Sequence, residues 1–112
     1  LGDALTLRVA DHAHFAEALA VAQAALPGAG RFLCAVAGPV EPGRAALTNA
    51  AWVIEAAALP FAEVRLLNDL EAMAWSLEAV EAEAWRVGTP APDAPRLVIA
   101  PGTGLGLAAR QG

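Results

Sequence analysis

Asn68 and Asp69 are the residues of this chain whose types best suit acid–base chemistry on an alcohol. They close an apolar segment that reads as a strand, Glu63–Asn68, and they precede a stretch with helical spacing. Ligands collect at the carboxyl ends of strands in α/β sheets. A carboxylate held there can accept a proton from a bound hydroxyl, and the amide beside it can both donate and accept hydrogen bonds. The pair suits a polyol such as a sugar, although for the dipeptide alone a purely structural role of Asp69, capping a helix that starts at Leu70, is favoured.

A glycine-rich segment near the C-terminus, Pro101-Gly102-Thr103-Gly104-Leu105-Gly106, is the second candidate for chemistry. Glycines let backbone N–H groups approach an anion without a side-chain clash, and Thr103 adds a hydroxyl donor. These are the features that a nucleotide phosphate requires. The segment is not a Walker A loop, because no Lys-Ser or Lys-Thr follows the glycines.

Two other interpretations of the glycines stay open at this point. Gly104, Gly106 and Ala109 fit the looser dinucleotide fingerprint G-x-G-x-x-A, which requires a helix to follow. A flexible hairpin turn is the third interpretation. The residues after Gly106 discriminate the dinucleotide fingerprint from a phosphate loop of the kinase type, because the first predicts a helix there and the second predicts a strand that completes a hairpin.

The elements that must position these residues alternate between strands and helices. Residues 5–10 alternate apolar and polar and predict a strand, and Asp11 is placed to cap a helix with Phe15, Leu19, Ala22 and Leu26 on one face. Pro27-Gly28 ends that helix. Residues 31–38 predict a strand that is buried on both faces.

Further along the chain, Gly38-Pro39 and Pro42-Gly43 mark turns. The remaining elements are predicted in order as a short strand at 44–49, an alanine-rich helix at 52–59, the strand Glu63–Asn68, a helix at 70–85, a proline-rich linker at 88–95 and a strand at 96–100. This alternation indicates an α/β architecture with parallel strand pairs.

Composition excludes several classes of function. The chain has 112 residues, 57% hydrophobic and 17% charged, with a net charge of -5, which disfavours nucleic acids and acidic lipid surfaces as partners. No apolar run approaches the ~20 residues that span a bilayer, so no membrane association is expected. Cys34 is the only cysteine and reads as an inert core thiol. His12 and His14 have no acidic or cysteine partners at metal spacing, so no metal site is predicted.

Taken in order, three segments of the chain resemble bacterial-type glucokinases of the hexokinase-like, actin-fold superfamily. They are CAVAGPV with LTNAAW at residues 34–40 and 47–52, LLNDLEA at residues 66–72, and IAPGTGLGLA at residues 99–108. The resemblance runs from about residue 5 to the end. It implies an α/β fold of the ribonuclease-H-like (actin-like ATPase) type, a small domain with a mixed sheet and flanking helices, here incomplete.

The resemblance also implies a function and roles for residues. The function is ATP-dependent phosphorylation of glucose to glucose 6-phosphate, with Mg²⁺ as cofactor. Asp69 would bind the sugar and act as general base for its 6-hydroxyl, and Asn68 would hydrogen-bond the sugar. The second phosphate loop would be formed by Gly102, Thr103, Gly104 and Gly106. Thr48, Asn49 and Trp52 would be structural positions that shape the cleft.

The chain departs from the family's pattern at its two ends. No D-x-G-G-T-N loop precedes Leu1, and the family's sugar-binding Glu and His lie beyond the glycine segment. Residues 1–92 are therefore expected to be most of a small domain and residues 93–112 the start of a large one. The 112-residue chain alone is expected to be inactive, to self-associate as a homodimer or larger species, and to come from a cytoplasmic protein. Another hexose as substrate, or a non-catalytic nucleotide-binding module, are the alternatives.

Overall fold

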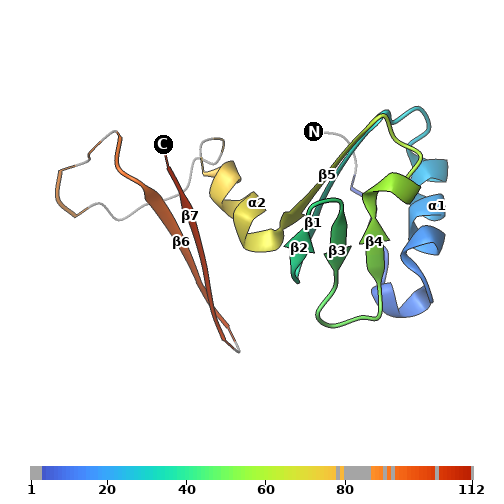
Figure 1. Ribbon diagram of the computed structural model, residues 1–112, viewed down its shortest axis with the longest axis horizontal. Coiled ribbons are helices and arrows are strands. Elements are labelled where there is room, and N and C mark those ends of the chain that lie inside the picture. The colour runs from blue at the N-terminus through green and yellow to red at the C-terminus, as the bar shows by residue number, and fades with distance from the viewer. Residues whose placement is uncertain are drawn as a thin grey trace. The chain divides into compact units, whose positions relative to one another are not determined.

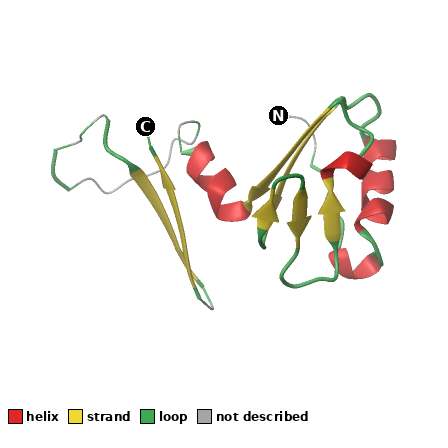
Figure 2. Ribbon diagram, viewed as in Figure 1, coloured by secondary structure: helices red, strands yellow, loops and turns green. Residues whose placement is uncertain are grey.

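The computed structural model describes residues 4–77, 79, 87–89, 91, 93–102 and 104–111 (Figure 1). The chain divides into two compact units, Leu1–Asn68 and Asp69–Gly112. Each unit contains helix and strand (Figure 2), as expected for an α/β chain. The predicted boundary between residues 92 and 93 concerns domains of a longer protein, and it stays a prediction.

The N-terminal part of the first unit differs from the sequence expectation. The strand predicted at residues 5–10 is wrong: residues 4–8 have no regular structure, and a 3₁₀ turn, η1, spans Val9–Asp11. Six alternating residues make a strand only where a neighbouring strand pairs with them, and none of the described strands does so. Asp11 belongs to this turn, where its carboxylate lies 4.0 Å from Arg8 Nε, so its predicted capping role is also wrong.

Helix α1 spans Phe15–Ala25, and its N-cap is His14, whose side chain makes no capping hydrogen bond. Glu17, in the first turn, accepts with its Oε2 the N–H of Ala13, the residue before the N-cap, at 2.9 Å. The predicted end of the helix is confirmed, since Gly28 follows it with φ of 86°.

A parallel pair of strands, β1 (Arg31–Val36) and β5 (Glu63–Asn68), confirms two predicted strands and the expected parallel pairing. The expectation that residues 31–38 are buried on both faces is wrong. Cys34 and Val36 pack toward the core, whereas Leu33 on the opposite face is 67% exposed. The described residues cover one face of the pair and leave the other open.

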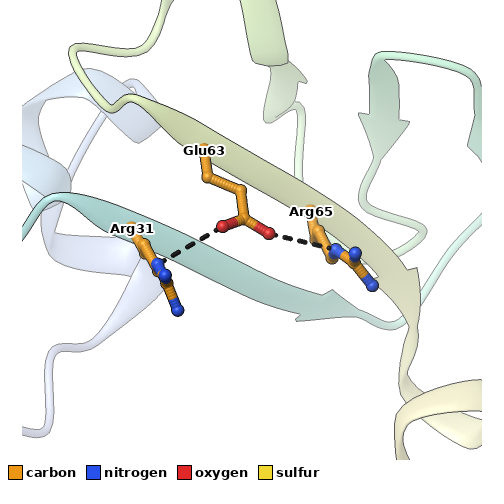
Figure 3. A network of polar contacts seen from close by, with 3 residues as sticks. All are labelled: Arg31, Glu63 and Arg65. Atoms are coloured by element: carbon orange, nitrogen blue, oxygen red, sulfur yellow. Dashed lines mark ion pairs between the residues drawn. The ribbon is translucent and has the colours of Figure 1, made fainter.

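An ion-pair network lies on that open face (Figure 3). Glu63 stands between two arginines: one of its carboxylate oxygens lies 3.3 Å from Arg31 Nε and the other lies 3.4 Å from Arg65 Nε. All three side chains are largely exposed, so the network contributes at most about 1 kcal/mol to stability.

Three short antiparallel strands complete the first unit, in the order β2 (Val40–Glu41), β3 (Arg44–Ala46) and β4 (Val53–Glu55). The turn predicted at Pro42-Gly43 is confirmed, with φ of 77° at Gly43. The strand predicted at 44–49 is shorter than expected, because it ends at Ala46.

The alanine-rich helix predicted at 52–59 is wrong. Its first half is strand β4, and only Ala56–Ala58 turn, as a 3₁₀ helix, η2. Ile54 explains the difference: it is 1% exposed and pairs with the fully buried Ala45, in a core that also contains Val36. Burial of a β-branched side chain in a sheet overrides the helix propensity of the alanines.

The second unit consists of helix α2 (Asp69–Ser76) and the antiparallel hairpin of β6 (Arg96–Pro101) and β7 (Leu105–Arg110). Helix α2 packs against both strands. The helix predicted at 70–85 is confirmed for its first two turns but is shorter than predicted, because it ends at Ser76 and Leu77 lies in a turn. Residues 78 and 80–86 lie outside the described part of the chain. Among the described residues, no helix has the length and apolar character needed to cross a bilayer.

Candidate functional site

The carboxyl ends of β1 and β5 lie side by side, because Val36 pairs with Asn68 in the parallel register. Asn68 is half-buried at this point, and its Nδ2 donates a hydrogen bond to the carbonyl oxygen of Gly38 at 3.1 Å. The amide predicted to bind a sugar is therefore anchored to the loop that follows β1. Such an anchor restricts the rotation of the side chain and pre-orients it.

The loop after β1 is fixed in turn by the end of β3 and the segment beyond it. Thr48 donates two hydrogen bonds to the Ala37 carbonyl oxygen, one from its backbone N–H and one from Oγ1, both at 2.9 Å. Gly38 lies so close to Ala46 that a β-carbon at position 38 would collide with the Ala46 carbonyl oxygen. The Gly38-Pro39 pair predicts a turn at this place. The close contact of Gly38 with the backbone of Ala46 could not be predicted from the sequence.

Asp69 is the first residue of α2 and its side chain is exposed. Its Oδ1 accepts the backbone N–H of the next residue, Leu70, at 2.9 Å. A helix cap accepts an N–H two or three residues further on, so this bond does not test the capping interpretation. A carboxylate offers about four acceptor positions on its two oxygens. One hydrogen bond to Leu70 is therefore compatible with a second role toward a bound hydroxyl.

Leu70 connects this end of α2 to the hairpin. Its side chain lies against Gly106 in β7, and a β-carbon at position 106 would collide with Leu70 Cδ1. Gly106 pairs with Ala100, one step from the Pro101–Leu105 pair that closes the described ladder. The first turn of α2 thus packs beside the part of the hairpin that leads into the glycine turn.

The glycine turn itself is tight. Gly102 donates its N–H to the Gly104 carbonyl oxygen at 2.8 Å, so this N–H closes the turn. Among the described residues other than its chain neighbours, a β-carbon added at Gly104 would meet no atom within 4 Å, and one at Gly102 would meet only Gly104 O at 3.9 Å. The described residues therefore leave space beside both glycines for an approaching group. Thr103, predicted to donate a hydroxyl here, lies outside the described residues.

The residues after Gly106 exclude one of the interpretations of the glycines. Strand β7 runs through Gly106 and on to Arg110. The dinucleotide fingerprint needs a helix at this place, so that interpretation is wrong. A hairpin with glycines at its turn fits both the phosphate-loop interpretation and a plain hairpin turn.

The predicted site residues fall in both units. Asn68 ends the first unit, whereas Asp69, Gly102, Gly104 and Gly106 belong to the second. Their proposed roles stay predictions. Within the part of the chain that the structure describes, no three His, Cys, Asp or Glu side chains gather as a metal site would require.

Cys34 is the one titratable group of the described chain with a clear perturbation. Burial in β1 raises the pKa of its thiol, because desolvation disfavours the charged thiolate. A neutral, half-buried thiol is a poor nucleophile, which agrees with the prediction that Cys34 is a core residue.

Nearly the whole chain is similar to one known protein family. A family profile described as Glucokinase matches residues 2–111. A glucokinase of Mesorhizobium japonicum is 43% identical over 81 residues, covering 66% of this chain and 24% of that protein. A glucokinase of Stenotrophomonas maltophilia strain K279a is 40% identical over 91 residues, covering 70% of this chain and 27% of that protein.

A solved structure of a glucokinase from an Antarctic psychrotroph matches 91% of this chain with a TM-score of 0.77 and 26% sequence identity. This likeness confirms the expected α/β fold of the actin-like ATPase kind. The chain spans 34% of that structure and about a quarter of the curated relatives that it matches.

Proposed function

The chain belongs to the glucokinase family, and on that premise we propose that the full-length protein transfers the γ-phosphoryl group of ATP to the 6-hydroxyl of glucose. The chain supplies an acid at the start of α2 and a glycine turn between β6 and β7. The observation that carries the proposal is the contact of Leu70 with Gly106, since it joins the element bearing Asp69 to the element bearing the glycines.

On the acceptor side, Asp69 removes the proton from the 6-hydroxyl as that oxygen attacks the γ-phosphorus. The carboxylate is exposed, and its hydrogen bond from Leu70 fixes one of its oxygens. Asn68, anchored on Gly38, hydrogen-bonds the sugar. Phosphoryl transfer asks for positioning and a base near the hydroxyl more than for covalent chemistry by the protein.

On the donor side, the glycine turn receives the phosphates of ATP. The open space beside Gly102 and Gly104 fits an anion that approaches the backbone closely. Gly102 gives its N–H to the turn, so its contribution is the shape of the loop. Thr103 adds a hydroxyl donor, and Gly106 allows the hairpin to pack against Leu70.

Magnesium fits this arrangement as an ion carried by the nucleotide. Mg²⁺ keeps several waters and is usually held by substrate phosphates with one or two carboxylates, so it needs no cluster of protein ligands. When bound, it spreads the charge that develops on the phosphates.

Replacement of the acid in the full-length protein tests the proposal. Asp69→Asn keeps an acceptor for the Leu70 N–H and is well tolerated at a helix start, so the fold should survive. We expect kcat to fall by roughly 10² to 10⁴, the usual contribution of a general base. Glu71→Gln, two residues on in the same helix, removes an exposed carboxylate without a proposed role and serves as the control. More than a tenth of normal turnover in the Asp69→Asn variant would sink the proposal.

A panel of sugars with the full-length protein separates the remaining alternatives. Higher kcat/KM for another hexose would identify a related sugar kinase, and ATP binding without phosphorylation of any sugar would identify a non-catalytic module. The 112-residue chain alone should show no phosphorylation. Robust turnover by it would contradict the assignment of the missing functions to segments outside this chain.

Partners and location follow from the same proposal. Glucose and ATP are the small-molecule partners, and nucleic acid and membranes are not partners, as the charge of -5 and the composition suggest. The protein acts in the cytoplasm, where Cys34 remains a free thiol.

A homodimer is proposed on the apolar face of the hairpin, where Leu97, Ile99, Leu105 and Leu107 are each more than half exposed.

A further inference from the structure

The loop that follows β1 makes an unusual double contact with Thr48. Both donors of this residue, the backbone N–H and Oγ1, reach the same acceptor, the Ala37 carbonyl oxygen, at 2.9 Å each. The next carbonyl along the chain, that of Gly38, is the acceptor for Asn68 Nδ2. Thr48 and Asn68 therefore hold two consecutive peptide groups of one loop, although they lie 20 residues apart in the sequence.

The orientations of two consecutive carbonyl groups are coupled through the residue between them. The peptide groups are planar, so only the two dihedral angles of Gly38 separate the carbonyl held by Thr48 from the carbonyl that anchors Asn68. Glycine is the residue with the widest choice of those angles, and at position 38 that freedom has to be limited by contacts. The two hydrogen bonds from Thr48 and the close approach of Ala46 to Gly38 supply this limit.

We propose that Thr48 is a positioning residue for sugar binding: it fixes the peptide group between Ala37 and Gly38, and through it the orientation of the Asn68 side-chain amide. This inference rests on the proposed function, because it assigns a remote support to the residue that contacts the sugar. Thr48 bonds the Ala37 carbonyl oxygen, and Asn68 bonds the carbonyl oxygen of the next residue, Gly38. Thr48 therefore acts on Asn68 indirectly, through Gly38.

Loss of the Oγ1 hydrogen bond is the first test, in the full-length protein. Thr48→Val keeps the shape and the backbone N–H contact and removes only the hydroxyl donor. We expect KM for glucose to rise roughly three- to tenfold, the usual effect of one neutral hydrogen bond. KM for ATP and kcat should stay within about twofold, because an interaction made equally in ground and transition states appears in KM alone.

Two control variants separate positioning from a general loss of stability. Thr48→Ser restores the hydroxyl donor and should return KM for glucose to the normal value. Thr6→Val makes the same chemical change at an exposed threonine for which the described part of the chain shows no hydrogen bond, and it should change nothing. A Thr48→Val protein with a normal KM for glucose would overturn the inference, as would failure of Thr48→Ser to restore it.

A double-mutant cycle tests whether Thr48 acts through Asn68. In an Asn68→Ala background the support has nothing left to orient, so Thr48→Val should add less than a twofold change in KM for glucose. Additive effects of the two substitutions would overturn the inference even if each raises KM alone.

Glucose binding by calorimetry repeats the cycle without turnover. A protein that binds glucose but never phosphorylates it refutes the proposed function and still tests this inference. A full-length protein that does not bind glucose at all refutes both.

Discussion

The side chain of Leu70 occupies the space beside Gly106 that a β-carbon would need. Leu70 follows Asp69 in the first turn of α2, and Gly106 lies two residues beyond Gly104 in the glycine turn. One apolar contact thus joins the neighbour of the proposed base to the strand that leaves the proposed phosphate loop. Glycine at position 106 is explained by this packing, because the backbone conformation there is ordinary.

Three glycine-to-alanine substitutions should rank by what the new methyl group meets. At Gly38 it meets the Ala46 carbonyl oxygen, which cannot move without disrupting β3, so the free energy of unfolding should fall by about 2 kcal/mol or more. At Gly106 it meets the end of a leucine that can rotate, so the loss should stay near 1 kcal/mol. At Gly30 it meets no atom of the described residues within 4 Å, and stability should change by less than about 0.5 kcal/mol.

Urea unfolding of the full-length protein and its three variants measures this ranking. An additional Leu70→Ala substitution should remove the penalty at Gly106 and leave the penalty at Gly38 unchanged, because only the first collision involves Leu70. Equal losses at Gly38 and Gly30 would contradict the close approach of Gly38 to Ala46.

The fold was predictable where local pattern and tertiary contacts agree. Strands β1 and β5 and helix α1 have clear apolar patterns, α1 is followed by Pro27-Gly28, and the structure confirms all three elements. Prediction failed where contacts with residues distant in the sequence determine the secondary structure. Residues 52–59 have the alanines of a helix, but Ile54 pairs with Ala45 in the core, and this long-range contact leaves no trace in the local sequence.

The candidate site was predictable in its residue types and not in its supports. Asn68 and Asp69 are recognisable because polar residues at the end of an apolar strand stand out. The hydrogen bonds from Thr48 to Ala37 and from Asn68 to Gly38 span 11 and 30 residues. Contacts of this kind depend on the three-dimensional arrangement of loops, and no spacing rule in a single sequence indicates them.

Burial of Cys34 predicts a pH dependence for its reactivity. Because desolvation raises the pKa of this thiol, the thiolate forms at higher pH in the folded chain than in the unfolded chain. Alkylation of the 112-residue chain by iodoacetamide should therefore reach half of its maximal rate above about pH 8.5, the usual cysteine value. The same chain in urea is the control, since it has only this one cysteine.

The same shift has a consequence for stability. A raised pKa in the folded state means that the unfolded chain releases its proton first as pH rises. The contribution of the neutral thiol to stability is complete below the unfolded pKa and is lost as pH rises through the folded pKa. Cys34→Ser should lack this alkaline loss in urea titrations, and alkylation at pH 7 as fast in the folded chain as in urea would contradict the burial of the thiol.

The network of Figure 3 predicts a small stabilisation that depends on salt. Glu63→Gln removes the charge between Arg31 and Arg65 and leaves the two guanidinium groups near one another. Stability should fall by no more than about 1 kcal/mol at low salt, and the difference should vanish near 1 M salt. Glu41→Gln, an exposed acid with no ion pair in the described part of the chain, controls for net charge. A loss that persists in high salt would point to packing and not to charge.

The open face of the β6–β7 hairpin predicts self-association of the 112-residue chain. Side chains alternate along both strands, so Val98 is buried while Ile99 and Leu107, paired directly across the hairpin, are 55% and 56% exposed on the other face. Leu97 and Leu105 extend the same surface, and an apolar patch of this kind is stabilised when a second copy covers it.

Light scattering of the 112-residue chain should show a mass above that of the 11.4 kDa monomer, and this mass should rise with protein concentration. Ile99→Thr with Leu107→Thr places β-branched residues of good strand propensity at both positions and should restore the monomer. Val21→Thr with Leu26→Thr removes two exposed apolar side chains from α1 and its C-cap and should not restore it. A monomer at all concentrations would show that this face does not bind a second copy.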